Sequence, residues 1–453
     1  YPNYHAIMTH CDARDVRSAF YRAWSTRASG EGGHPEWDNT GVIERILELR
    51  HEAAGLVGFD NYADYSLATK MAGTVDEVLD FLTELAERSR GAAEREFEAI
   101  QAMSDESLAA WDVAYYLDKL KQQKFSVSDD ILRQYFPFDV VKRGMFGLAE
   151  TLYNLTVEQN DSVCGWHETV RYFEIKDASG SIVGSFYTDL FARTGKRGGA
   201  WMDECVVRKA FDDEVTHPVG YLVCNFPPPD GDGNSLLTHT DVVTLFHEFG
   251  HMLHHLLTRI GYPSIAGING VPWDAVELPS QFMENFAWCY DVLKTSSAHV
   301  ESGDPLPKDL FDKLDSSRHF GEALSMLRQI EFALFDFRLH AGFEPGSGGR
   351  VLETLQQVRD EVAVIQHPAY NRLPHSFSHI FAGGYAAGYY SYKWAEVLAA
   401  DAFSAFEESG IFDAETAARF REEILEVGGS RDFMEAYVAF RGRKPTLDAL
   451  LRQ

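Results

Sequence analysis

Residues 244–258 hold the feature that most constrains what this chain can fold into. Within them, His247, Glu248 and His251 form the pattern H-E-x-x-H. Apolar residues recur around this pattern at helical spacing, so we expect a buried helix. Residues four apart lie on one face of a helix, with Cβ atoms about 5–6 Å apart. Two imidazoles at that separation can bind one metal ion, so the pattern predicts a metal site on a helix.

Glu248 lies about 100° around the same helix from His247. A carboxylate in that position borders the metal-binding face without being a ligand, and it can take a proton from a water at the metal. The alternative is that two core histidines match the pattern by chance, which 17 histidines among 453 residues would allow. The pattern therefore indicates a metallopeptidase, but it requires a third ligand.

The third ligand has several candidates. One class of metallopeptidases places a third histidine six residues after the second, but that position is Leu257 here, which excludes the class. His254 and His255 follow too closely on the same helix to complete a tetrahedron. A glutamate on another helix is the remaining common choice. Glu277 follows a turn-rich stretch at 267–270 that would let a second helix pack on the first. The alternative for Glu277 is a solvated glutamate in the first turn of its helix.

Three segments carry a resemblance to a known family. Residues 247–255, 273–285 and 379–392 are similar to segments of the thimet oligopeptidase and oligopeptidase A family of zinc metallopeptidases, nearest to its oligopeptidase A branch. The likeness covers essentially the whole chain. It implies a mainly α fold, a large helical catalytic region of the neurolysin-like type with a small antiparallel sheet beside the zinc helix. It also implies one Zn²⁺ per chain. The ligands that it implies are His247, His251 and Glu277.

The resemblance also assigns roles to the segment at 379–392. Tyr385 and Tyr392 would stabilise the transition state, with His379 nearby. The glycine-rich loop before Tyr385 is flexible by composition and could close on the substrate. The further residues expected to contact substrate there are Tyr389, Gly383 and Gly384.

The reaction implied is the hydrolysis of internal peptide bonds in short peptides, with Glu248 as the general base. Two alternatives stay open. One is a dipeptidyl carboxypeptidase on the same scaffold, and the other is an inactive protein that only holds peptides. The intact H-E-x-x-H pattern argues against the second, because binding alone needs no general base.

The charge and the cysteines narrow the setting in which the protein works. The formal net charge is −28, which argues against a general nucleic-acid binder. Apolar runs stay short of the ~18 residues that a membrane helix needs, so we expect no membrane partner. Five scattered cysteines without C-x-x-C pairing favour a reducing compartment. We expect a cytoplasmic monomer, with an organellar matrix as the alternative compartment.

The chain reads as one catalytic region over 1–453 without a convincing linker. The expected parts are helices over 1–165, a small sheet at about 168–226, zinc-site helices over 241–295, and C-terminal helices with the tyrosine loop over 308–453. One long core helix is expected over 313–340. The chain begins without Met, and the resemblance implies that a helical N-terminal region of the same protein precedes it.

The segment 196–201 is the expected edge of the small sheet. Glycines there allow close backbone approach, so an extended peptide could pair with the backbone at Gly199 and Ala200. A plain hairpin corner is the alternative for this segment.

Overall fold

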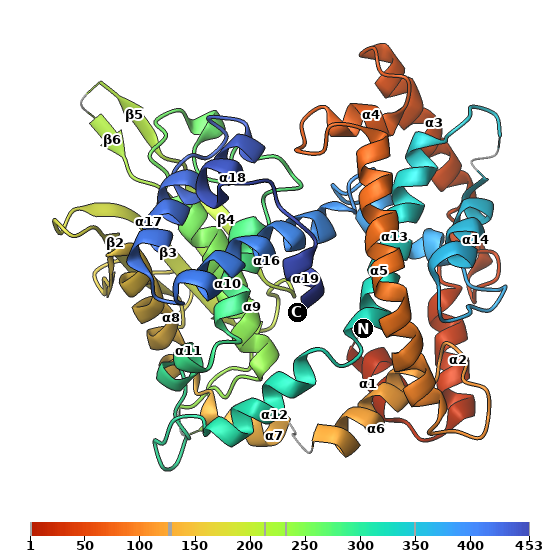
Figure 1. Cartoon of the computed structure of the whole chain (residues 1–453), viewed down its shortest axis with the longest axis horizontal. Helices are drawn as coiled ribbons and strands as arrows, with labels where there is room; N and C mark the ends of the chain where they lie inside the picture. The colour runs from red at the N-terminus through yellow and green to blue at the C-terminus, as the bar shows by residue number, and fades with distance from the viewer. Residues whose placement is uncertain (1, 126–128, 213, 232, 348–349, 453) are drawn as a thin grey trace. The chain divides into compact units, whose positions relative to one another are not determined.

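The computed structural model describes residues 2–125, 129–212, 214–231, 233–347 and 350–452 (Figure 1). The chain divides into two compact units. Unit 1 comprises Tyr1–Ser126 and Ser316–Lys393, and unit 2 comprises Val127–Asp315 and Trp394–Gln453. Each unit therefore combines two separate stretches of sequence. The expected C-terminal part over 308–453, for example, contributes residues to both units.

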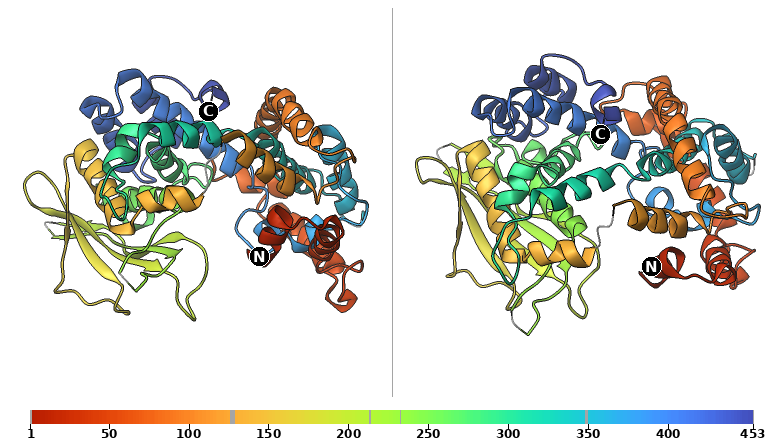
Figure 2. Two further views of the ribbon diagram at one scale, coloured as in Figure 1. Left: turned by 90° about the horizontal axis from the view of Figure 1, so that it is seen from below. Right: turned by 60° about the horizontal axis from the view of Figure 1, so that its bottom comes forward.

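Unit 1 is helical, and α5 (Val75–Gln101) packs along α13 (Glu322–Ala341) at its centre (Figures 1 and 2). Thr74 begins α5, since its side chain accepts a hydrogen bond from the Glu77 backbone amide at 3.1 Å. The other helices of this unit are α1 (Pro2–His10), α2 (Arg14–Ser25), α3 (Thr40–Leu56), α4 (Tyr62–Leu67), α6 (Val113–Phe125), α14 (Val351–Val362) and α15 (Ser378–Phe381). The chain passes between the units within α12 (Lys308–Arg318) and α16 (Ser391–Ser409).

The single helix expected over 313–340 is wrong, because the chain turns between α12 and α13. Gly321 adopts a left-handed φ of 81° at the break. The carboxylate of Glu96 on α5 accepts hydrogen bonds from the backbone amides of Gly321, Ala323 and Leu324. A glutamate from another helix thus satisfies the free amides that begin α13.

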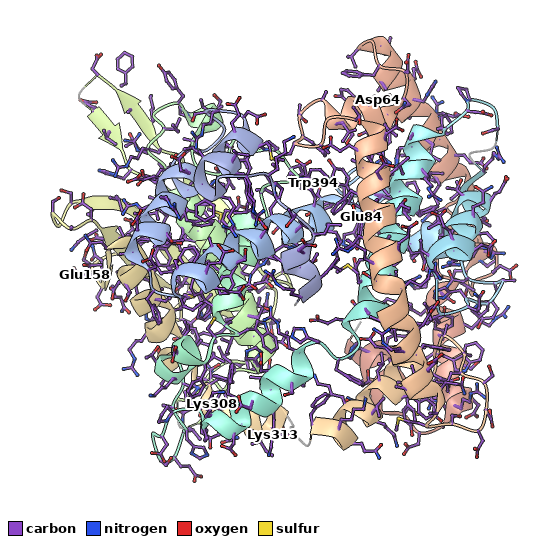
Figure 3. The ribbon with its side chains drawn as sticks, in the orientation of Figure 1. Asp64, Glu84, Glu158, Lys308, Lys313 and Trp394 are labelled. Carbon is purple, nitrogen blue, oxygen red and sulfur yellow. The ribbon has the colours of Figure 1, made fainter. Side chains whose placement is uncertain are left out.

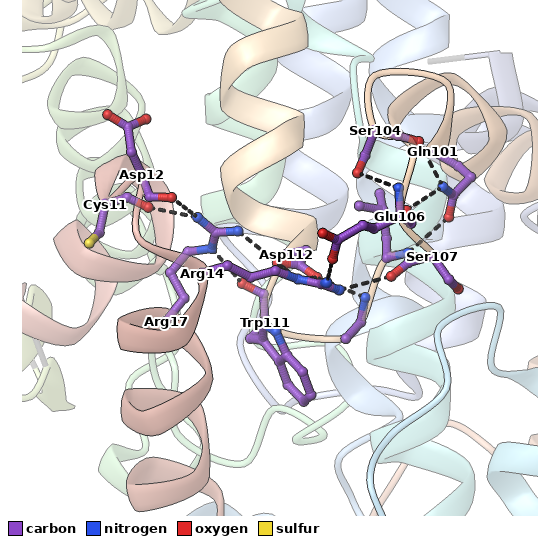
Figure 4. Close-up of polar contacts among 12 residues, drawn as sticks. Cys11, Asp12, Arg14, Arg17, Gln101, Ser104, Glu106, Ser107, Trp111 and Asp112 are labelled. Carbon is purple, nitrogen blue, oxygen red and sulfur yellow. Dashed lines mark hydrogen bonds and ion pairs between the residues drawn. The ribbon is translucent and has the colours of Figure 1, made fainter.

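A buried ion-pair cluster fixes the start of unit 1 (Figure 4). Asp112 is fully buried and accepts hydrogen bonds from the guanidinium groups of Arg14 and Arg17. Burial opposes ionisation of this carboxyl, yet hydrogen bonds from Arg14, Ala109 and Arg17 hold its pKa below the usual range. The cluster ties α2 to the segment that leads into α6.

Unit 2 contains a five-stranded sheet in the order β1-β2-β3-β7-β4. The strands are β1 (Thr156–Gln159), β2 (Arg171–Lys176), β3 (Ile182–Phe191), β4 (Trp201–Val206) and β7 (Val219–Phe226). The exposed Glu158 lies at the β1 edge (Figure 3). Its carboxylate pairs with Lys176 of β2 at 2.6 Å.

The sheet is mixed, whereas the sequence predicted an antiparallel one. β3 and β7 run parallel, and the other neighbouring strands run antiparallel. Parallel neighbours need a long connection, and residues 192–218 supply it. They carry β4 and a separate two-stranded hairpin of β5 (Lys209–Phe211) and β6 (Glu214–Thr216).

Two helices, α8 (Phe138–Tyr153) and α9 (His239–Leu256), pack on one face of this sheet. Phe146 of α8 contacts Phe186 of β3 and Phe249 of α9, which forms an aromatic core between helices and sheet. Gly220 of β7 lets α9 approach closely, since a Cβ there would lie 2.5 Å from the Met252 sulfur.

The remaining helices of unit 2 complete a mainly α fold, which confirms the expected class. They are α7 (Asp129–Leu132), α10 (Leu278–Phe286), α11 (Tyr290–Thr295), α17 (Ala414–Phe420), α18 (Phe433–Arg441) and α19 (Asp448–Arg452). None of the described helices combines the length and apolarity that a bilayer crossing requires.

Candidate metal centre and active site

The predicted metal helix is α9. It begins with a reciprocal cap, in which the Thr238 side chain accepts from the Asp241 amide and the Asp241 carboxylate accepts from the Thr238 amide. One face of α9 is buried on the sheet. His247 and His251 lie one turn apart on another face, with ring centroids 5.0 Å apart. The helix therefore presents the two imidazoles side by side, as the spacing predicted.

Glu277 joins the two histidines from the start of α10. Its Oε2 atom lies 3.1 Å from His251 Nε2 and 3.4 Å from His247 Nε2. Ser280 Oγ donates a hydrogen bond to the same carboxylate at 2.9 Å. Donor atoms around a tetrahedral zinc ion lie about 3.4 Å apart, given the usual bond lengths. Among the described residues, these three form the only cluster whose donor atoms could hold a metal ion.

The crossing of α9 and α10 depends on Gly250, whose part in the site the sequence analysis did not recognise. A Cβ at Gly250 would contact the carbonyl oxygen of Pro279 and lie 2.6 Å from the Cα atom of Ser280. The backbone of α10 therefore lies directly against α9 at this point. Glu277 immediately precedes α10, so this close approach is what carries its carboxylate to the two histidines.

Glu284 also belongs to the site, and the sequence analysis missed it. Its Oε1 atom lies 2.6 Å from His247 Nδ1, which leaves Nε2 directed at Glu277. Burial disfavours the charged imidazole, but hydrogen bonds to Glu277 and Glu284 raise the pKa of His247 to about 10. A carboxylate on the second nitrogen orients a ligand histidine and increases its basicity. The available signal was the seven-residue spacing from Glu277, two turns along one helical face.

Glu248 lies beside this cluster but outside it. The residue is only 5% exposed, and burial raises the pKa of its carboxyl group. The Met202 backbone amide on β4 hydrogen-bonds to the carboxylate, while Oε2 has no hydrogen-bond partner among the described residues. An unpartnered buried carboxylate oxygen next to three convergent donors suits a group that must accept a proton from a bound molecule.

His254 and His255 stay outside the metal cluster. Burial and the neighbouring His251 lower the pKa of His254 to about 3, so its ring is neutral. His255 directs Nε2 toward the carbonyl oxygens of Val206 and Val219, each at 3.2 Å. The inference that neither residue completes the tetrahedron agrees with this arrangement.

The tyrosine segment lies in unit 1, and the metal cluster lies in unit 2. Within unit 1, Tyr385 and Tyr392 stack with ring centroids 4.7 Å apart. The ring of the exposed His379 lies 6.2 Å from that of Tyr385 and 5.7 Å from that of Tyr389. The structure therefore brings together the four aromatic residues that the resemblance singled out.

Two further details concern the same segment. The Tyr389 hydroxyl donates to Gln329 Oε1 at 2.9 Å, and burial raises its pKa to about 12. Gly383 and Gly384 are exposed. A Cβ at Gly383 would lie 2.8 Å from the His379 carbonyl oxygen, so the tight turn before Tyr385 requires glycine there.

Gly199 and Ala200 lead into β4, which is an edge strand of the sheet. Gly199 is exposed, with a left-handed φ of 101°. The side-chain amide of Asn225 on β7 donates to the Gly199 carbonyl oxygen at 2.7 Å and holds the segment in place. Within the described part of the chain, β4 pairs with β7 alone as a strand, although the Glu204 amide donates to Asp203 Oδ1 and the Val206 carbonyl oxygen lies 3.2 Å from His255 Nε2.

Comparison with known proteins places this chain in a family. The model of peptidase family M3 matches residues 7–453. The chain belongs to peptidase family M3. It is 53% identical to oligopeptidase A of Salmonella typhimurium over 458 residues, which covers 99% of this chain and 67% of that protein. The expected metallopeptidase family is thereby confirmed.

One more distant relative and one solved structure extend the comparison. Dipeptidyl carboxypeptidase of Escherichia coli is 35% identical, with 97% of this chain and 65% of that protein covered. The solved structure of PZ peptidase A shares the fold with a TM-score of 0.59 at 15% identity, covering 99% of this chain and 69% of that one.

Gly250→Ala tests the close helix crossing. We expect the added methyl group to force α10 away from α9 and to lower the free energy of unfolding by about 1–3 kcal/mol. Affinity for zinc, measured by competition with a chromophoric chelator, should fall with it. Gly147→Ala on α8 is the control, because a Cβ there meets no atom within 4 Å. Normal zinc binding by Gly250→Ala would contradict this account.

Glu284→Gln tests the hydrogen bond that orients His247. The amide can still accept or donate one bond, but it cannot support the imidazole as a charged partner does. We expect zinc affinity to fall about 10–100-fold, less than for Glu277→Gln, which removes a ligand. The same chelator competition measures both, with the exposed Glu301→Gln as control. Equal affinity in Glu284→Gln and the unchanged protein would remove this residue from the site.

Proposed function

We propose that this protein is a zinc-dependent oligopeptidase that hydrolyses internal bonds of short peptides. His247, His251 and Glu277 would hold one zinc ion per chain. The observation that carries the proposal is the convergence of these three donors beside the buried, unpartnered carboxylate oxygen of Glu248. The identity with oligopeptidase A relatives supports the substrate class.

Zinc bound by these residues would supply a Lewis acid that polarises the scissile carbonyl and makes water more acidic. Glu248 then takes a proton from the attacking water and passes it to the leaving amine. Its burial and raised pKa suit both directions of transfer. Glu284 keeps His247 in the orientation and tautomer that ligation needs.

The tyrosines and the sheet edge complete the proposal. Tyr385 and Tyr392 donate hydrogen bonds to the oxyanion as charge develops on it, and His379 acts close to them. This assignment rests on the match of the segment to the family. For the substrate backbone, we propose pairing with β4 at Gly199 and Ala200. Tyr389, Gly383 and Gly384 complete the list of proposed substrate contacts.

The proposal extends to the compartment and the oligomeric state of the protein. All five cysteines are free thiols, which suits a reducing compartment, and we propose the cytoplasm. The protein would act as a monomer on peptides.

Cleavage of defined peptides tests the proposed function. We expect zinc-dependent cleavage at internal bonds of peptides whose C-terminus is amidated, with products identified by mass spectrometry. Glu248→Gln should retain about one zinc per chain and lose turnover by several orders of magnitude, because only the base is removed. Normal turnover in Glu248→Gln would exclude the base role.

The amidated peptides separate the alternatives. A dipeptidyl carboxypeptidase would release dipeptides from free C-termini and fail on the blocked peptides. A protein that only holds peptides would bind them, in a fluorescence anisotropy assay, without forming products. Either result would replace the proposal.

Tyrosine substitutions test the oxyanion role. We expect Tyr385→Phe and Tyr392→Phe to lower kcat about 10²–10³-fold, with little change in KM, because the bond forms only in the transition state. Tyr390→Phe is the control on the same segment and should stay near wild type. An unchanged kcat with a raised KM in Tyr385→Phe would make the residue a ground-state binding group.

A further inference from the structure

One fully buried carboxylate, Asp336 on α13, lies directly under the tyrosine segment. Its Oδ1 atom accepts the backbone amide of Ala387 at 2.9 Å. Its Oδ2 atom accepts the amides of Gly388 and Tyr389 at 2.9 and 3.0 Å. Three consecutive backbone amides therefore converge on one side chain that has no solvent exposure. Such a concave arrangement of amides is a binding site for an anion.

The backbone at this point is held in an uncommon conformation. Ala387 adopts a left-handed φ of 45°, although it carries a Cβ and is fully buried. Residues other than glycine, asparagine and aspartate rarely adopt this region unless their surroundings impose it. The hydrogen bonds to Asp336 supply that constraint on one side. On the other side, the Ser66 hydroxyl donates to the carbonyl oxygen of Ala387 at 2.9 Å.

Asp336 is itself oriented by neighbours in unit 1. Arg50 donates to His340 Nε2 at 3.0 Å, and a guanidinium can only donate. The proton of the neutral ring must therefore sit on Nδ1, which lies 2.8 Å from the Asp336 carbonyl oxygen and 3.0 Å from its Oδ1. Arg50, His340 and Asp336 form a chain of hydrogen bonds that ends on the tyrosine segment.

We propose that Asp336 is a positioning residue for the reaction, which fixes Tyr385 and Tyr392 by binding the amides of residues 387–389. Those amides lie among the six residues between the two tyrosines, whose rings stack on each other. Displacement of reacting groups by about 1 Å can cost on the order of 10² in rate. The inference rests on the proposed role of the two tyrosines.

Asp336→Asn is the main test, because asparagine keeps the size but not the acceptor pattern. Its oxygen can face only one side of the site, so its NH₂ group must face a backbone amide that is also a donor. We expect kcat on short peptides to fall about 10–100-fold, with KM changed less than about threefold. Zinc content should stay at that of the unchanged protein, because the metal cluster lies in unit 2.

A matched control separates positioning from general stability. Asp112→Asn removes another fully buried carboxylate of unit 1, one that binds Arg14 and Arg17 (Figure 4). It should lower Tm without lowering kcat. A structural role alone would make the two variants behave alike, and that result would overturn the inference.

Rescue gives a second readout. Glycine adopts the left-handed region without a steric cost, so Ala387→Gly placed in the Asp336→Asn background should recover most of the lost kcat. Ser66→Ala, a milder change at the other anchor, should lower kcat in the same direction. If Asp336→Asn does not fold, the kcat of Ser66→Ala is compared with that of the control instead. No rescue by Ala387→Gly and no effect of Ser66→Ala would together overturn the inference.

Hydrogen exchange reports on the segment independently of activity. We expect the amides of residues 387–389 to exchange about tenfold faster or more in Asp336→Asn, without a similar change in the amides of α13. If the wild type cleaves no peptide, the proposed function fails, while the exchange result still decides whether Asp336 fixes the segment. If Tyr385→Phe lowers kcat and Asp336→Asn does not, the inference fails alone.

Discussion

The candidate site depends on how closely two helices can approach. At Gly250, the backbone of α10 lies where any side chain on α9 would otherwise be. This contact brings Glu277 from a different stretch of sequence to within 3.4 Å of both histidine Nε2 atoms. The H-E-x-x-H pattern can place two ligands by helical spacing alone. The third ligand is a tertiary property, and its position is set by one missing methyl group.

The same helix is restricted on its other side. Gly220 of β7 admits Met252, so α9 is clamped between the sheet and α10. A helix packed on two sides can exclude water from a carboxylate such as Glu248, and this burial raises the pKa of the group. The close packing around α9 therefore also raises the pKa of the proposed base. The edge strand β4 takes part in it, because the Met202 amide reaches the Glu248 carboxylate.

The sequence predicted most features that depend on local spacing. The α9 helix follows from periodicity and motif, and a small sheet was expected at about 168–226; the structure contains both. The position of Glu277 was implied by the family resemblance, and the structure brings its carboxylate to the two histidines. The parallel pairing of β3 with β7 and the break at Gly321 were not predicted, because distant segments decide them. Glu96, for example, binds the backbone amide of Gly321 at the break between α12 and α13, although it lies more than two hundred positions away in the sequence. Asp336 was overlooked for the same reason, since its partners are known only once the chain is folded. For Glu284, the seven-residue spacing from Glu277 was the only signal in the sequence.

The edge strand β4 has a consequence for solubility. An edge strand can offer its free backbone groups to a strand of another molecule, which is a route to aggregation. β4 is only six residues long and carries Asp203 and Glu204 side by side. In a chain of net charge −28, a second copy would bring like charges together at this edge. Self-association through β4 should therefore increase at high salt or low pH, where these charges are screened or neutralised.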